Sequence, residues 1–195
     1  MYRIAVFVSG SGSNLQSILD AVDKGELKVV VTSVISDNPK AEALKRAEAK
    51  NIPTFIIEKG KDRNAFGDKA LELIGDNLDL IVLAGFLSIL SGNILKVYKN
   101  KIINIHPSLI PKYCGKGMYG IRVHEAVLKG KEEVSGCTVH VVNEVIDGGD
   151  IILQKTVQVK HSDTPESLQK RVLIEEHKAL VQVIAMLAQE DINEN

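Results

Sequence analysis

The sequence lacks a long hydrophobic run and carries almost no net charge. The longest apolar run near its start, residues 4–8, is too short for a signal peptide or a membrane span. The formal net charge is −1, so the chain as a whole would attract neither nucleic acid nor an acidic membrane. We therefore expect a cytosolic protein with no nucleic-acid or membrane partner. The sequence does not indicate an oligomeric state.

Cysteine is scarce, and histidine is scattered. Cys114 and Cys137 have neither the spacing of metal ligands nor the number needed for a disulfide framework, so we expect two reduced thiols. The histidines show no close ligand spacing, and no metal site is predicted. They are His106, His124, His140, His161 and His177.

The chain is long enough for one domain and short for two. Its 195 residues are 45% hydrophobic and 25% charged, without repeats, linkers or low-complexity tracts. We expect a single domain over residues 1–195. Expected strands alternate with helices through the first hundred residues, which is typical of a parallel α/β sheet. The strands are 3–8, 29–36, 54–57, 80–84 and 102–106, and the helices are 15–22, 41–50, 64–74 and 86 to about 98.

The second half of the chain has a different pattern. Residues 108–120 read as a long loop, and no element is assigned to residues 121–136. Strands are expected at 137–142 and 151–159 around a turn at 147–150. A helix from 165 to about 189 is expected to complete the fold.

A glycine- and serine-rich loop, residues 9–14, joins the first expected strand to the first helix. A helix N-terminus offers free N–H groups to an anion, and glycine lets the backbone approach it closely. Leu15 stands where a dinucleotide fingerprint has its third glycine, and the P-loop lysine is missing. The loop therefore suits a terminal phosphate, with serine hydroxyls and Asn14 as further donors. A plain tight turn is the alternative.

Two polar residues share one face of the strand that Pro107 ends. Asn104 and His106 are two apart, so both could donate to an oxygen that becomes negative in a tetrahedral intermediate. The alternative is a core strand with two satisfied polar groups. Asp147 follows an apolar pair and precedes two glycines; near His106 it would favour the imidazolium and suit proton transfer. The same turn could simply close a hairpin. A serine hydrolase is a poor reading, because the glycine- and serine-rich loop lacks a nucleophile elbow.

These residues resemble the folate-dependent formyltransferases over nearly the whole chain. Residues 104–111 read Asn-Ile-His-Pro-Ser-Leu-Ile-Pro where the family shows Asn-x-His-Pro-Ser-Leu-Leu-Pro, and residues 83–86 and the Asp-Gly-Gly turn also match. The resemblance implies a three-layer, Rossmann-like α/β fold. Its sheet would be mostly parallel, with an antiparallel addition in the C-terminal half. It also implies formyl transfer from the co-substrate 10-formyltetrahydrofolate to the amine of glycinamide ribonucleotide in purine biosynthesis.

The resemblance implies roles by position. Asn104 and His106 would bind and polarise the formyl oxygen, and Asp147 would hold His106 protonated and help to pass a proton through water. The substrate phosphate would be held by Gly12, Ser13 and Asn14. Besides Asn104, the folate contacts would be Arg63 for the carboxylate tail and, lining the pocket, Leu87, Ser88, Ile89 and Leu90.

Glu176 lies in the middle of the apolar face of the last expected helix, where a charge needs a partner or a cleft. The resemblance implies contact with the ribose hydroxyls, and a salt-bridged helix residue is the alternative. The chain departs from the family at Ser88, where some relatives have arginine, and at Cys114, which replaces a common proline. Residues 116–119 add length to the loop. His124 and His140 match family histidines or are ordinary loop and strand residues.

Three other functions remain open. A formyltransferase acting on initiator tRNA would add a basic C-terminal domain, and a formyltetrahydrofolate hydrolase would add an N-terminal regulatory domain. We expect neither domain in this chain. A non-catalytic nucleotide-binding module would need the glycine loop but not Asn104, His106 and Asp147 together.

Overall fold

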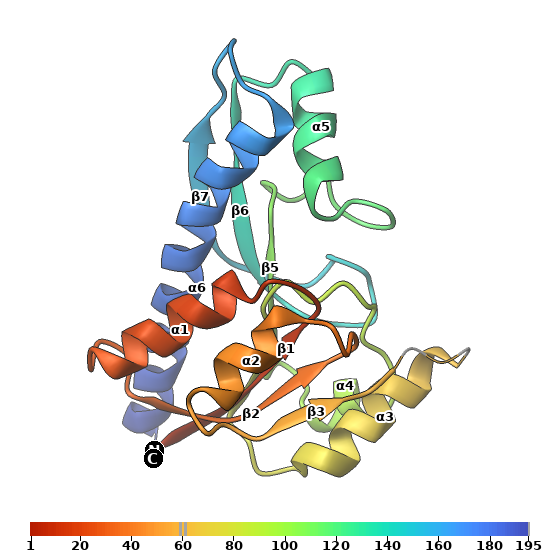
Figure 1. Ribbon diagram of the computed structural model, residues 1–195, viewed down its shortest axis with the longest axis vertical. Helices are drawn as coiled ribbons and strands as arrows, with labels where there is room; N and C mark the ends of the chain where they lie inside the picture. Colours follow the sequence, from red (N-terminus) through yellow and green to blue (C-terminus); the bar gives the residue numbers. More distant parts are fainter. Residues whose placement is uncertain (59, 61, 195) are drawn as a thin grey trace.

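A computed structural model describes residues 1–58, 60 and 62–194; the side chains of Arg63 and of residues 191–194 lie outside the description. In this part of the chain one sheet has the strand order β3-β2-β1-β4-β5-β6-β7 (Figure 1). Strands β1 to β5 are parallel, whereas β6 pairs antiparallel with both β5 and β7. The strands are β1 (Tyr2–Val8), β2 (Val29–Ser36), β3 (Thr54–Ile56), β4 (Leu80–Leu83), β5 (Ile102–His106), β6 (Val134–Val141) and β7 (Ile151–Gln158).

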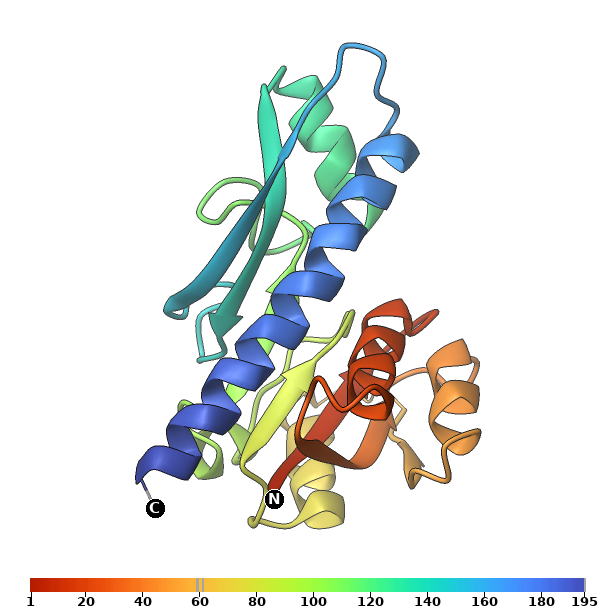
Figure 2. The ribbon, with the colours of Figure 1, turned by 90° about the vertical axis from the view of Figure 1, so that its left-hand side faces the viewer.

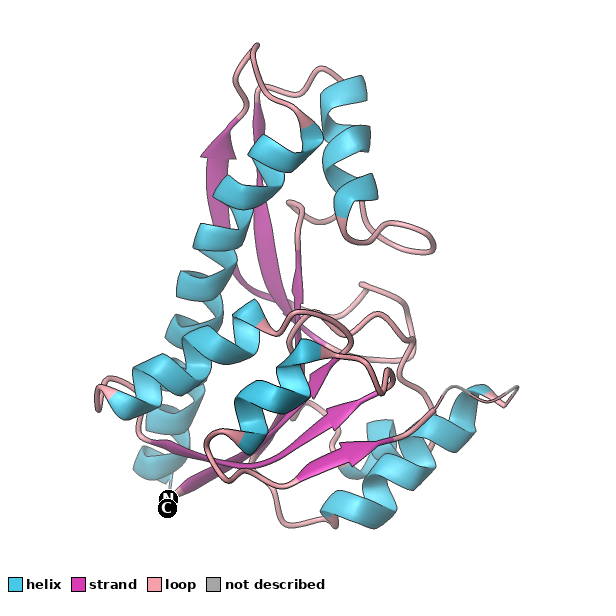
Figure 3. Cartoon of the chain, viewed as in Figure 1, coloured by secondary structure: helices cyan, strands magenta, loops and turns pink. Residues whose placement is uncertain are grey.

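Helices cover both faces of the sheet. Helices α1 (Ser13–Asp23), α2 (Glu42–Glu48) and α6 (Pro165–Glu194) pack on one face, and α3 (Arg63–Ile74) and α4 (Ile94–Val97) pack on the other. Figure 3 shows α1 and α2 side by side in front of the strands, and Figure 2 shows α6 running obliquely along the molecule. The sixth described helix, α5 (Ile121–Lys129), packs against α6.

The pleat of β1 explains this layering. Ile4, Val6 and Val8 are buried with α1, α2 and α6, whereas Ala5 and Phe7 are buried with α3 and α4. Successive side chains of a strand point to opposite faces, so a continuous apolar strand needs cover on both sides. The predicted three-layer, mostly parallel α/β fold with an antiparallel C-terminal addition is confirmed.

The structure corrects two expected elements and adds one. The helix expected over 86–98 is wrong except for its last turn, α4: Gly85 and Gly92 have positive φ angles of 70° and 94°, and the Leu87 amide donates to the Ser9 hydroxyl. Helix α6 runs to Glu194 rather than ending near 189. Helix α5 was not expected, although its buried Val123 and Val127 have helical spacing.

The strand order creates a crevice at one edge of the sheet. From β1 the chain passes through α1 to β2 on one side, whereas β4 lies on the other side of β1. Ligands bind at such a reversal, outside the carboxyl ends of the strands. Of the helices in the described residues, none combines the length and the apolar character needed to cross a membrane.

Candidate active site

A cavity of about 550 Å³ opens at the carboxyl ends of β1, β4 and β5. The cavity is lined by residues 10–14, 83–90, 104–107, 115–120 and 142–147, by one face of α6 and by His124 of α5. It therefore brings together nearly all the side chains that the sequence singled out. These are Gly12, Ser13, Asn14, Leu87, Ser88, Ile89, Leu90, Asn104, His106, Asp147 and Glu176. Of the residues to which the resemblance assigns a role, the remaining one is Arg63, whose side chain lies outside the described part of the chain.

The glycine loop ends in an uncapped helix N-terminus. Gly12 is the residue before α1, with φ of 74° in the left-handed region, and no side chain caps the helix. A Cβ at this position would lie 2.5 Å from Cβ of Ala43, so only glycine fits between the loop and α2. Within the described residues, the main-chain N–H groups of Ser11, Gly12 and Ser13 make no hydrogen bond to another backbone group. These free donors, at the positive end of α1, suit an anion.

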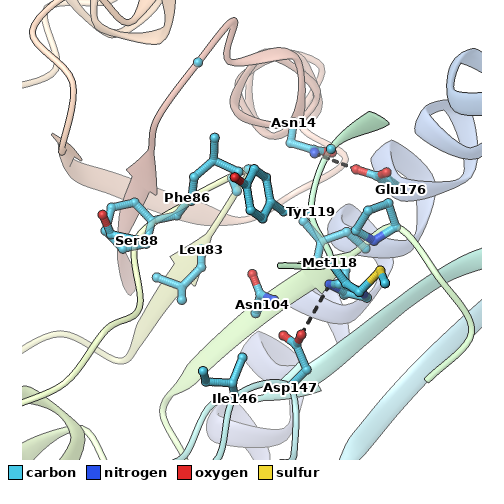
Figure 4. A pocket seen from close by; sticks show the side chains of 18 of the residues that line it. Asn14, Leu83, Phe86, Ser88, Asn104, Met118, Tyr119, Ile146, Asp147 and Glu176 are labelled. Carbon is cyan, nitrogen blue, oxygen red and sulfur yellow. Dashed lines mark hydrogen bonds and ion pairs between the residues drawn. The ribbon is translucent and has the colours of Figure 1, made fainter. Parts of the chain in front are cut away.

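Asn14 and Glu176 join the first helix to the last. The Asn14 Nδ2 atom donates to Oε2 of Glu176 at 2.9 Å, and both residues are buried (Figure 4). Burial raises the pKa of the Glu176 carboxyl. The Oδ1 atom of Asn14 is buried and accepts no hydrogen bond from the described residues. The pair thus presents oxygen acceptors to the cavity, which suits a ligand with hydroxyl donors.

His106 is held by the main chain on one side and faces a carboxylate on the other. Its Nε2 lies 3.0 Å from the carbonyl oxygen of Tyr113, which can only accept, so Nε2 carries a proton. Its Nδ1 lies 3.7 Å from Oδ2 of Asp147, which is ion-pair range rather than a hydrogen bond. The side chains of His106 and Asp147 are 6% and 12% exposed. Nδ1 is therefore the nitrogen that can gain or lose a proton next to Asp147.

Asp147 is itself fixed by the loop opposite. Its φ angle of 52° lies in the left-handed region, and its Oδ2 accepts a hydrogen bond of 2.7 Å from the Gly115 amide. The turn that carries Asp147 connects β6 to β7. It therefore closes a hairpin and also brings a carboxylate next to His106.

Asn104 pairs with a second imidazole. Its register partner on β6 is His140, and the Asn104 Nδ2 atom donates to His140 Nε2 at 3.1 Å. The other nitrogen of His140, Nδ1, donates to the Val141 carbonyl at 2.9 Å. Burial lowers the pKa of His140, in keeping with a neutral ring that accepts through Nε2. The second N–H of the Asn104 amide is left for the cavity.

His124, at the start of α5, also lines the cavity. It is 1% exposed, and burial, with a smaller contribution from the nearby His106, lowers its pKa to about 4. Its Nδ1 is buried without a hydrogen-bond partner in the described residues. His124 is therefore a neutral polar group at neutral pH.

The family model described as "Formyl transferase" matches residues 2–184. The chain belongs to the formyl transferase family. It is 38% identical over 194 residues to the chloroplastic phosphoribosylglycinamide formyltransferase of Arabidopsis thaliana, covering 97% of this chain and 66% of that protein. It is 40% identical over 190 residues to the phosphoribosylglycinamide formyltransferase of Haemophilus influenzae, covering 94% of this chain and 86% of the relative. The chain thus spans just under two thirds of the plant relative.

A solved structure gives the same family. The glycinamide ribonucleotide transformylase 1 of Symbiobacterium toebii superposes with a TM-score of 0.87 at 36% identity. The match covers 97% of this chain and 89% of that one. The seven-stranded sheet of the described residues is therefore the formyl transferase sheet.

The mouth of the formyl transferase cavity is apolar. Leu87, Ile89, Val145 and Ile146 are exposed hydrophobic side chains among the residues that line it, and the buried Leu90 lines it as well. Exposed apolar side chains gathered at one cavity indicate a surface for a flat, apolar part of a ligand. Ser88 also lines the cavity, and its Oγ donates to Oδ2 of Asp37 at 2.5 Å, which fixes the side chain at the wall.

Several groups of the formyl transferase site are main-chain atoms that the sequence did not reveal. The Tyr113 carbonyl orients His106, and the Gly115 amide orients Asp147. Both lie in the loop over 108–120, which has no periodic pattern from which a conformation follows. Among the described residues there is no group of three or more His, Cys, Asp or Glu side chains arranged to hold a metal ion.

Proposed function

We propose that the chain transfers the formyl group of 10-formyltetrahydrofolate to the amine of glycinamide ribonucleotide. One observation carries the proposal: a single cavity joins the free N-terminus of α1 to the His106–Asp147 pair and Asn104. An anion anchor at one end and a proton-transfer pair at the other suit a phosphorylated amine whose nitrogen must be deprotonated as it reacts. The names of the relatives from Arabidopsis and Haemophilus support the same substrate.

The reaction is a direct transfer between two nitrogens. The substrate amine attacks the formyl carbon, and the formyl oxygen becomes an oxyanion that accepts hydrogen bonds from the Asn104 amide and from protonated Nδ1 of His106. The amine loses a proton towards Asp147, directly or through a water, and the leaving nitrogen of tetrahydrofolate gains one. The bond between the formyl carbon and the folate nitrogen then breaks. The Tyr113 carbonyl keeps His106 oriented throughout, because it holds Nε2.

The phosphate and ribose of the substrate lie at the other end of the cavity. Gly12, Ser13 and Asn14 bind the phosphate through the main-chain N–H groups at the start of α1. One N–H of the Asn14 side-chain amide donates to Glu176, which ties the phosphate loop to α6. Glu176 accepts from the ribose hydroxyls, with Oδ1 of Asn14 as a further acceptor.

The folate occupies the apolar mouth. Leu87, Ile89 and Leu90 contact its flat ring system, with Ser88 and Asn104 as polar neighbours. A contact of Arg63 with the carboxylate tail stays a prediction, since that side chain is outside the described residues. We also propose that the chain works as a single domain and that it works in the cytosol. Fractionation of the source cells tests the proposed location.

The test is the release of tetrahydrofolate from 10-formyltetrahydrofolate with three acceptors. Purified protein is supplied with glycinamide ribonucleotide, with water alone, or with aminoacylated initiator tRNA. We expect turnover only with glycinamide ribonucleotide, and none from His106→Ala. His161→Ala, which changes an exposed histidine away from the cavity, is the matched control and should keep full activity. Equal turnover with water alone would identify a hydrolase instead.

A further inference from the structure

Helix α2 holds the glycine loop from behind. The Ala43 amide donates to the Gly10 carbonyl at 3.2 Å, and Nε of Arg46 donates to the Ser11 carbonyl at 2.8 Å. Two consecutive carbonyls of the loop are thus fixed towards α2. The same helix also lies close to Gly12. A Cβ added at Gly12 would lie 3.3 Å from Cδ of Arg46.

This contact decides where the next N–H groups point. In a trans peptide the C=O of one residue and the N–H of the next point in opposite directions. The Ser11 and Gly12 N–H groups therefore point away from α2. With Gly12 in the left-handed conformation, successive N–H groups of this kind form a concave nest for an anion. Arg46 fixes the peptide that carries the Gly12 N–H.

Arg46 is itself locked in place. Its Nη1 donates to Oε1 of Gln16 at 2.9 Å, and Nε2 of Gln16 donates to Oδ1 of Asp20 at 2.7 Å. The guanidinium therefore spans the loop, α1 and α2 with two bonds of fixed relative geometry. A lysine ammonium has no planar fork and cannot reproduce both bonds in this arrangement.

We infer that Arg46 is a positioning residue for the substrate phosphate, acting through the Ser11–Gly12 peptide rather than by touching the substrate. The inference rests on the proposed function and deepens it. Without the guanidinium the Ser11 carbonyl is free to rotate, and the Gly12 N–H no longer points steadily at the phosphate. Binding of the phosphate weakens, while the chemistry at His106 and Asp147 continues.

The test compares Arg46→Met and Arg46→Lys with Lys45→Met, which removes the same charge from an exposed neighbour on α2. Each is assayed with glycinamide ribonucleotide and with glycinamide riboside, which lacks the phosphate. We expect Arg46→Met to raise the KM for the ribonucleotide roughly tenfold, the effect of about one charge-assisted hydrogen bond, with kcat within about twofold. Arg46→Lys should also raise the KM for the ribonucleotide, at least severalfold. With the riboside, all variants should have the same KM and kcat as the parent chain.

An equal loss with ribonucleotide and riboside would show a general structural role and overturn the inference. Full activity of Arg46→Lys would overturn it as well, because charge alone would then suffice. Calorimetric binding of ribose 5-phosphate and of ribose separates this inference from the proposed function. If the parent chain does not formylate glycinamide ribonucleotide but Arg46→Met still selectively loses ribose 5-phosphate, the function fails and the positioning role stands. Equal affinity of both proteins for ribose 5-phosphate rejects the role.

Discussion

The Nε2 atom of His106 donates to the Tyr113 carbonyl, so the nitrogen of His106 that faces Asp147 is Nδ1. Because a carbonyl cannot donate, this bond requires a proton on Nε2 and leaves Nδ1 to face the carboxylate. The His106 ring can therefore exchange a proton with a group in the cavity through Nδ1, without rotating about its side-chain bonds. A mechanism that needs the ring to flip would have to break a bond at a buried site.

The carboxylate of Asp147 should be needed for turnover rather than for folding. Asp147→Asn replaces a charged acceptor by an amide beside Nδ1 of His106, and we expect kcat to fall by about 10²-fold or more. Asp150→Asn, a change in the same turn at an exposed residue, is the control and should lose little. Steady-state kinetics and circular dichroism of both variants make the measurement. Activity of Asp147→Asn near that of the parent would remove Asp147 from the proposed chemistry.

Glu176→Gln should separate binding from chemistry. The variant keeps the shape of the side chain but loses the charged acceptor at the end of the cavity near Asn14, so we expect the KM for glycinamide ribonucleotide to rise about tenfold with little change in kcat. Since burial raises the pKa of Glu176, the neutral variant should be no less stable than the parent at pH 8. Glu175→Gln, next to it on α6, is the control. A fall in kcat with unchanged KM would contradict the ribose role.

Gly12→Ala should destabilise the fold. The added Cβ would lie 2.5 Å from Cβ and 2.7 Å from Cα of Ala43, and φ is 74°. Left-handed backbone and overpacking together should cost on the order of 3 kcal/mol in the free energy of unfolding, measured by urea denaturation. Gly10→Ala is a matched control, because a Cβ there meets nothing within 4 Å. Similar stability of the two variants would show that α2 yields easily at this contact.

Stability should rise with pH over the range in which His124 titrates. The pKa of His124 is about 4 in the folded chain and 6.5 in the unfolded chain, so the unfolded state binds more protons between these values. The free energy of unfolding therefore falls as pH drops from 6.5 to 4, by an amount on the order of 2 kcal/mol from this residue. The lowered pKa values of His140 and His177 act in the same direction, and the raised pKa of Glu176 acts against it.

His124→Gln should flatten this pH profile. Urea unfolding at a series of pH values measures it, with His161→Gln as the exposed control. An unchanged slope in His124→Gln would mean that the ring is hydrated in the folded chain.

The strand patterns predicted the sheet because each apolar run had to be covered on both faces. Asn104 and His106 could be placed on one face from the period of a strand alone, and Glu176 was conspicuous as a charge within an apolar helical stripe. Three features could not be obtained in this way. The pairing of Asn104 with His140 depends on strand register, the bond from His106 to Tyr113 depends on the path of a loop without periodicity, and α5 has only two buried valines as a signal.

The hydrogen bond from Asn14 to Glu176 closes a span of 162 residues. During synthesis the glycine loop emerges well before Glu176, so this end of the cavity stays half built until α6 has also emerged. Such a distant contact also carries a large loop-closure entropy and is made late in refolding. A ligand that needs both Asn14 and Glu176 can therefore bind only after α6 has packed against α1.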